Sequence, residues 1–183
     1  FVAQSAMAEA AAHFQRALAQ LALIPSTLAR ERQELELTIA LAASSQTAKG
    51  LAAPETGQAF TRAMKLWEQL GCPVEYSRAP LGLSGYHTNR GDLEVAERLN
   101  ADFLRLAKGR GEPSLLCTAH AIAGRTLTFT GRFSEAREHL ESAGKIYDQI
   151  PQQRSFSQYG LTPRTAADGY LALVLFCTGS PDR

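Results

Sequence analysis

The chain has 183 residues, of which 45% are apolar and 20% are charged, and these values are ordinary for a globular protein with a sizeable core. Its 19 basic and 18 acidic residues give a formal net charge of +1, which excludes the broad basic surface of a protein that binds nucleic acid or anionic membranes. No apolar run reaches the roughly 18 residues that a membrane-spanning helix needs, so no membrane segment is expected.

Five helices are predicted in the N-terminal part of the chain. The third has the clearest apolar stripe, in which Phe60, Ala63, Trp67 and Leu70 recur at helical spacing. The fourth is the weakest, because proline and glycine lie inside it. The predicted ranges are 2–24, 28–48, 54–70, 75–89 and 93–106, the last of them capped by Asp92.

Three more helices follow an exposed loop at 108–113. They are predicted at 114–130, 133–149 and 162–178, and a longer polar loop at 151–161 separates the last two. No segment alternates apolar and polar residues as a strand would. The chain is therefore expected to be all-α, with about eight helices.

A repeated helical hairpin is the strongest pattern in the sequence. Small and large residues at fixed positions of two successive helices match the skeleton of the tetratricopeptide repeat (TPR). Small side chains let the two helices approach, and large side chains fill the space beside them. The matching residues are His120, Ala123, Gly124, Leu127, Gly131, Phe133, Ala136, Leu140, Ala143 and Pro151.

The same frame recurs earlier in the chain. Gly91 and Gly131 are 40 residues apart, as are Ala96 and Ala136. This period is longer than the roughly 34 residues of a standard TPR, so the predicted fold is a TPR-like α-solenoid of antiparallel helical hairpins. We expect one domain over 1–183, with repeat units at about 1–25, 26–73, 74–112, 113–151 and 152–183.

Both ends of the chain fall inside this frame. The first helix matches the second half of a hairpin, and Gly179 begins the turn that normally precedes another helix. We therefore expect the chain to be a piece of a longer array. The last helix is apolar on nearly every side, which predicts self-association through that end when no further helix covers it.

No catalytic motif is complete. The segment around Ser84 lacks the final glycine of a nucleophile elbow, and the four histidines lack the spacing of zinc ligands. His120 is interpreted as a packed residue of the repeat. The three cysteines are far apart and form no C-x-x-C pair, which favours a reducing, cytoplasmic setting without disulfides or structural zinc. We expect no enzymatic activity, no metal and no cofactor.

A binding groove is predicted on the surface that first helices line in such repeats. Two arginines with hydroxyl and amide neighbours are a chemistry that holds carboxylate or phosphate groups. Counting from the Gly124 frame gives the following candidates: Arg78, Thr88, Asn89, Thr118, Arg125, Thr128 and Phe129.

Three segments carry a family resemblance: RQELELTIALAASSQTAKGLAAPETGQAFTRAMKLWEQLG (32–71), GRFSEAREHLESAGKIYD (131–148) and YGLTPRTAADGYLALVLFCTGSPDR (159–183). They resemble the C-terminal TPR-like array of large bacterial signalling proteins that join a class III adenylate/guanylate cyclase to an AAA/STAND-type ATPase. The resemblance implies a cytoplasmic multidomain parent whose catalytic residues all lie outside this chain.

Function is accordingly expected to be regulatory. The leading hypothesis is an interaction module that binds a protein, a peptide or a small effector in its groove and transmits this to attached domains. The alternative is the effector-sensing array of a MalT-like transcription activator, which a helix-turn-helix domain elsewhere in the parent would indicate. An enzyme with an unrecognised helical active site is the third possibility, and turnover of nucleotides by the isolated chain would indicate it.

Overall fold

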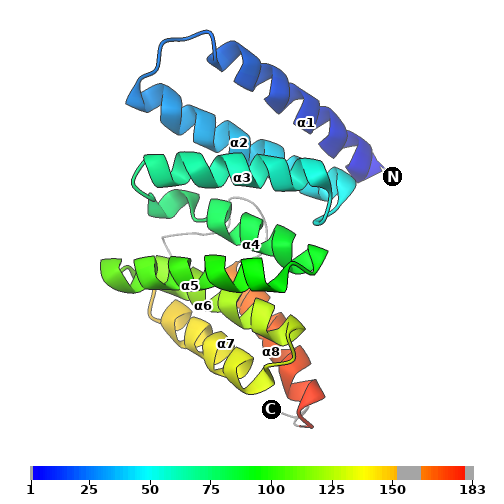
Figure 1. The fold of residues 1–183 in the computed structure, drawn as a ribbon, viewed down its shortest axis with the longest axis vertical. Helices are drawn as coiled ribbons and strands as arrows, with labels where there is room; N and C mark the ends of the chain where they lie inside the picture. The colour runs from blue at the N-terminus through cyan, green and yellow to red at the C-terminus, as the bar shows by residue number, and fades with distance from the viewer. Residues whose placement is uncertain (1, 152–161, 180–183) are drawn as a thin grey trace. The chain divides into compact units, whose positions relative to one another are not determined.

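The protein is described by a computed structural model that covers residues 2–151 and 162–179 (Figure 1). These residues form eight α-helices and one short 3₁₀ helix, and no strand is found in these two ranges. The all-α prediction is confirmed. The chain divides into two compact units, Phe1–Arg90 and Gly91–Arg183, and each is described by itself.

The first unit consists of four α-helices that pack in chain order. Each contacts the helix that follows it, and α2 also contacts α4. The sequence predicted one helix over 75–89, whereas the structure has a 3₁₀ turn followed by a shorter helix. The elements are α1 (Val2–Leu21), α2 (Leu28–Lys49), α3 (Pro54–Gln69), η1 (Val74–Tyr76) and α4 (Arg78–Arg90).

The second unit repeats this arrangement. Each helix again packs on the next in the chain, and α6 also contacts α8. A contact between alternate helices places α6 and α8 side by side, which is how the first helices of successive hairpins stack in a helical repeat. The elements are α5 (Leu93–Arg110), α6 (Pro113–Phe129), α7 (Phe133–Asp148) and α8 (Pro163–Cys177).

Helix starts follow the signals in the sequence, with one exception. Pro54, Pro113 and Pro163 each lie in a first turn, where the missing N–H leaves no helical bond unmade. The Thr162 hydroxyl accepts a 3.1 Å hydrogen bond from the backbone N–H of Thr165. The predicted Asp92 cap is wrong in detail: Asp92 occupies the N-cap position of α5, but its side chain makes no capping hydrogen bond.

Close approach of α6 and α7 depends on Gly124. A Cβ atom at this position would lie 2.6 Å from Cγ of Leu140 and 3.2 Å from the backbone oxygen of Ala136. Leu140 is 1% exposed, and Ala136 and Ala143 are fully buried. The predicted interlock of small and large residues in this hairpin is confirmed.

Glycines also set the contact between α3 and α4 in the first unit. A Cβ at Gly82 would lie 2.0 Å from the ring of Phe60, and a Cβ at Gly57 would lie 2.2 Å from the ring of Tyr86. Each helix thus contributes one glycine on which an aromatic ring of the other helix rests. Gly82, two residues before Ser84, therefore serves helix packing.

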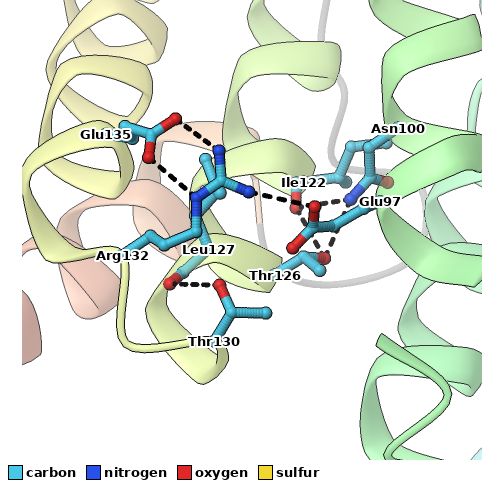
Figure 2. Close-up of polar contacts among 8 residues, drawn as sticks. All are labelled: Glu97, Asn100, Ile122, Thr126, Leu127, Thr130, Arg132 and Glu135. Atoms are coloured by element: carbon cyan, nitrogen blue, oxygen red, sulfur yellow. Dashed lines mark hydrogen bonds and ion pairs between the residues drawn. The ribbon is translucent and has the colours of Figure 1, made fainter. Parts of the chain in front are cut away.

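Polar contacts join three helices of the second unit (Figure 2). Asn100 of α5 donates a 2.8 Å hydrogen bond to the Thr126 hydroxyl of α6. Arg132, just before α7, pairs with Glu97 of α5 at 3.0 Å and with Glu135 of α7 at 2.5 Å. These contacts fix the register of α5 against the α6–α7 hairpin, because Asn100 is buried and its amide would otherwise be unsatisfied.

Candidate functional site

The predicted groove residues of the first unit all lie on α4. Thr88 is buried, and its hydroxyl donates a 2.8 Å hydrogen bond to the backbone oxygen of Ser84. Asn89 is exposed and donates from its amide to the backbone oxygen of Gly85. Arg78 is half-buried at the start of the helix. Asn89 and Arg78 are therefore the members of this set that present surface to a partner.

The predicted groove residues of the second unit all lie on α6. Thr118 and Thr128 are buried, and each hydroxyl bonds to a carbonyl of its own helix, those of Ser114 and Gly124. Arg125 is half-buried, and burial lowers the pKa of its guanidinium, which nevertheless stays cationic at neutral pH. Phe129 is 51% exposed.

Phe129 adjoins an apolar surface that was not part of the groove predicted from the sequence. The ring of Phe129 meets the ring of Tyr170 edge-on, with centroids 5.9 Å apart. Tyr170 lies on α8, whose Val174 is buried while Leu173 and Phe176 are 44% and 71% exposed. The apolar pattern of this helix therefore divides into one covered face and one open face.

The binding role of the seven predicted groove residues on α4 and α6 stays a prediction.

A surface hollow lies between α3 and α4 within the first unit. Its volume is about 460 Å³, which is within the usual range for small ligand sites. Gly57 makes this shape possible, since any side chain there would displace the ring of Tyr86. The hollow is lined by Pro54, Gly57, Gln58, Thr61, Arg62, Lys65, Tyr86 and His87.

The charge of this hollow is positive. Its lining contains Arg62 and Lys65 but no Asp or Glu. Arg62 pairs at 2.5 Å with Glu34 of α2, and the same Glu34 carboxylate also pairs with Arg30 at 3.2 Å. One carboxylate thus serves two arginines. Lys65 is exposed, and no ion pair of its side chain is found among the residues that the structure describes.

Two histidines face each other across the α6–α7 hairpin. The ring centroids of His120 and His139 are 4.9 Å apart, and no hydrogen-bond partner of either Nδ1 is found in the described part of the chain. Burial, the neighbouring His139 and Lys108 lower the pKa of His120 to about 4. Burial and Lys108 also lower the pKa of His139. Both rings are therefore neutral at pH 7, and the interpretation of His120 as a packed residue is confirmed.

The described residues contain neither a metal-binding cluster nor a membrane-spanning helix. Within 2–151 and 162–179, no three His, Cys, Asp or Glu side chains are grouped so that they could bind a metal ion. None of the helices in these ranges combines the length and the apolar character required to span a bilayer. Cys117 is buried, and burial raises the pKa of its thiol to about 12, so it is not a reactive nucleophile at neutral pH.

Comparison with solved structures identifies the fold. The chain is similar to RapI in its apo form, with a TM-score of 0.68 and 17% sequence identity over 96% of this chain. The fold is a TPR-like helical repeat. The match spans 45% of the RapI chain, so this protein covers about half of the length of that neighbour. No family model and no curated protein matches the chain.

Several of these features were missed by sequence reasoning. The hollow combines Gly57 of α3 with Tyr86 of α4, and the sequence contains no signal for the register that brings them together. The histidine pair had a weak signal: His120 occupies the position where the TPR pattern has tryptophan, which predicts contact with the second helix. The hydroxyls of the buried residues Thr88, Thr118 and Thr128 each donate to a carbonyl four residues earlier in the same helix, which is a common local pattern for threonine.

Proposed function

We propose that this chain is a non-catalytic regulatory module that binds a protein partner. The observation that carries the proposal is the contact between alternate helices, α2 with α4 and α6 with α8, which stacks first helices in each unit. Helical repeats use the surface formed by such helices for binding. The proposed contacts are Arg78 and Asn89 on this surface of the first unit, and Arg125 and Phe129 on the corresponding surface of the second unit.

We also propose the kind of parent protein to which this module belongs. The sequence resemblance favours a cytoplasmic parent that contains a nucleotide cyclase and an ATPase, with this repeat transmitting partner or effector binding to those domains. A second candidate is the sensor array of a MalT-like transcription activator.

The open face of α8, with Leu173 and Phe176, favours a further helix or a second copy of the chain as an additional contact.

Partner capture tests the binding proposal. The chain is immobilised and exposed to extract from cells that express the parent, and retained proteins are quantified by mass spectrometry. Replacing Arg78 and Arg125 with alanine should reduce retention of the specific partner at least fivefold, because two charge-assisted contacts are lost. Circular dichroism checks that the variant keeps its helices, and Arg78→Lys with Arg125→Lys should retain part of the binding.

The matched control replaces Arg16 and Arg105 with alanine. Both are exposed arginines, one in each unit, and neither belongs to the proposed surface. This control should retain the partner as the unchanged chain does. Equal retention by the groove variant and the control would reject the proposed surface, and turnover of nucleoside triphosphates by the purified chain would reject a non-catalytic module.

A further inference from the structure

We propose that the hollow between α3 and α4 is a docking site for an acidic, partly apolar peptide segment of a partner protein. The inference rests on the proposed function, since it presumes that the repeat binds a protein, and it adds the site and the chemistry of one contact. The site differs from the surface proposed above: most of its lining comes from α3, a second helix of a hairpin, and it includes neither arginine of that surface.

The positive charge of the hollow favours an anionic occupant. Two cationic side chains, Arg62 and Lys65, line the hollow, and its lining contains no carboxylate. Glu34 is 8% exposed and lies between Arg30 and Arg62, so it neutralises only part of the local positive charge. Lys65, one turn after Thr61 on α3, is left to pair with a carboxylate supplied from outside.

The shape of the hollow favours an extended peptide chain over a planar ring that would stack on Tyr86. One face of the Tyr86 ring rests on Gly57, and the guanidinium of Arg90 lies over the ring at 5.6 Å from its centroid. The Tyr86 hydroxyl accepts a 3.3 Å hydrogen bond from Arg90. Because Gly57 covers one face of this ring and Arg90 lies over it, a planar base has little aromatic surface on which to stack. The ring edge, Pro54 and the aliphatic parts of Gln58 and Lys65 instead offer contact to an aliphatic side chain.

Polar groups on the rim are suited to a peptide backbone. Gln58 and Thr61 lie one turn apart on α3 and are both exposed. The Thr61 hydroxyl donates a 2.8 Å hydrogen bond to the backbone oxygen of Gly57, which leaves its oxygen able to accept a hydrogen bond from a peptide N–H. The Gln58 amide can both donate and accept. The site thus provides backbone, aliphatic and carboxylate contacts over one continuous surface.

Fluorescence polarisation of short labelled peptides tests this site on the complete chain. The probe alternates leucine with glutamate or aspartate, and the reference peptide has glutamine and asparagine in their place. The acidic peptide should bind at least fivefold more tightly than the amide peptide. Lys65→Gln should weaken acidic-peptide binding about fivefold, which corresponds to roughly 1 kcal/mol for one partly exposed charged contact.

The control is Lys145→Gln, which removes another exposed lysine, on α7 in the other unit, and should change binding less than twofold. Because Lys65 is exposed and outside the core, its replacement should leave the helical signal and the melting temperature unchanged. Equal binding of the two peptides, or no effect of Lys65→Gln, would overturn the proposal. Tighter binding of adenosine monophosphate than of the acidic peptide would also overturn it, in favour of a nucleotide site.

Failure here is distinguishable from failure of the proposed function. If the peptides do not bind at the hollow but partner capture still depends on Arg78 and Arg125, the docking site is wrong and the regulatory module stands. If partner capture is unaffected by those arginines but is lost in Lys65→Gln, the hollow stands and the proposed surface on first helices is wrong.

Discussion

Replacing Leu140 with alanine should lower the free energy of unfolding by about 2–4 kcal/mol. Leu140 is 1% exposed and fills the space beside Gly124 in the α6–α7 hairpin, where it packs with Val174 of α8 and Cys117 of α6 in one cluster. The truncation removes apolar contacts and leaves a cavity, because α6 and α7 already lie too close for further collapse. Urea unfolding followed by circular dichroism at 222 nm measures the change.

Leu173→Ala is the matched control for this variant. Leu173 is 44% exposed on the open face of α8, so its truncation should change the free energy of unfolding by less than about 0.5 kcal/mol. If Leu140→Ala were as mild as Leu173→Ala, the hairpin seam would not be a principal source of stability in the second unit.

Stability should fall as the pH is lowered from 6.5 towards 4, and the histidine pair should account for part of the loss. The ordinary pKa of histidine is 6.5, and the folded-state pKa of His120 is about 4. Between these values the unfolded chain binds more protons than the folded chain, so acidification favours unfolding; above pH 6.5 this group has no effect. His139 shifts in the same direction. After allowance for partial exposure, the loss at pH 4.5 should be about 1–2 kcal/mol.

The measurement compares pH profiles of stability for the unchanged chain and for His120→Phe, a replacement that keeps an aromatic ring at this position. The variant should lose less stability between pH 7 and pH 4.5. Glu135 also loses part of its stabilising contribution as the pH falls to its ordinary value of 4.5 and below, because its folded-state pKa is lowered chiefly by its hydrogen bond to Arg132. Only the difference between the two profiles therefore reports on His120. Parallel profiles for the unchanged chain and His120→Phe would refute the assignment.

Much of the architecture could be predicted from the sequence because it depends on local signals. Helical patterning and turn signals predicted all eight helices, and Pro54 and Pro163 marked two of the starts. Pro113 was expected in a loop, but it lies in the first turn of α6. The repeat frame also predicted one tertiary contact, that of Gly124 with Leu140, since a hairpin with a short turn fixes which faces of its two helices meet. Asp92 shows the limit of such signals: its position at the helix start was correct, and its side chain was not used as the cap.

The candidate sites were less accessible to sequence reasoning, because they depend on side-chain orientation and on register between hairpins. The frame placed Thr118 and Thr128 on a binding surface, but both hydroxyls are directed to carbonyls of α6 and both side chains are buried. The hollow requires that Gly57 and Tyr86, which lie in different hairpins of the predicted repeat, meet across α3 and α4. No pattern within either helix specifies that contact.

The division of the chain into repeat units stays a prediction. The predicted unit at 74–112 contains α4 and α5, and these helices belong to the two separately described compact units. The units predicted at 26–73 and 113–151 each contain one hairpin whose helices pack on each other, α2 with α3 and α6 with α7.

A double-mutant cycle between Gly124 and Leu140 tests most directly that a tight seam of small and large residues builds this fold. Alone, Gly124→Ala should lower the free energy of unfolding by about 1 kcal/mol, because its Cβ would meet Cγ of Leu140 at 2.6 Å. In the Leu140→Ala background the same change should be close to neutral, because the clash with the leucine side chain is gone and alanine favours helix, while the 3.2 Å contact with the backbone oxygen of Ala136 remains. Gly169→Ala, at an open helical position, should raise stability by up to about 1 kcal/mol. The same effect of Gly124→Ala in both backgrounds would contradict the account.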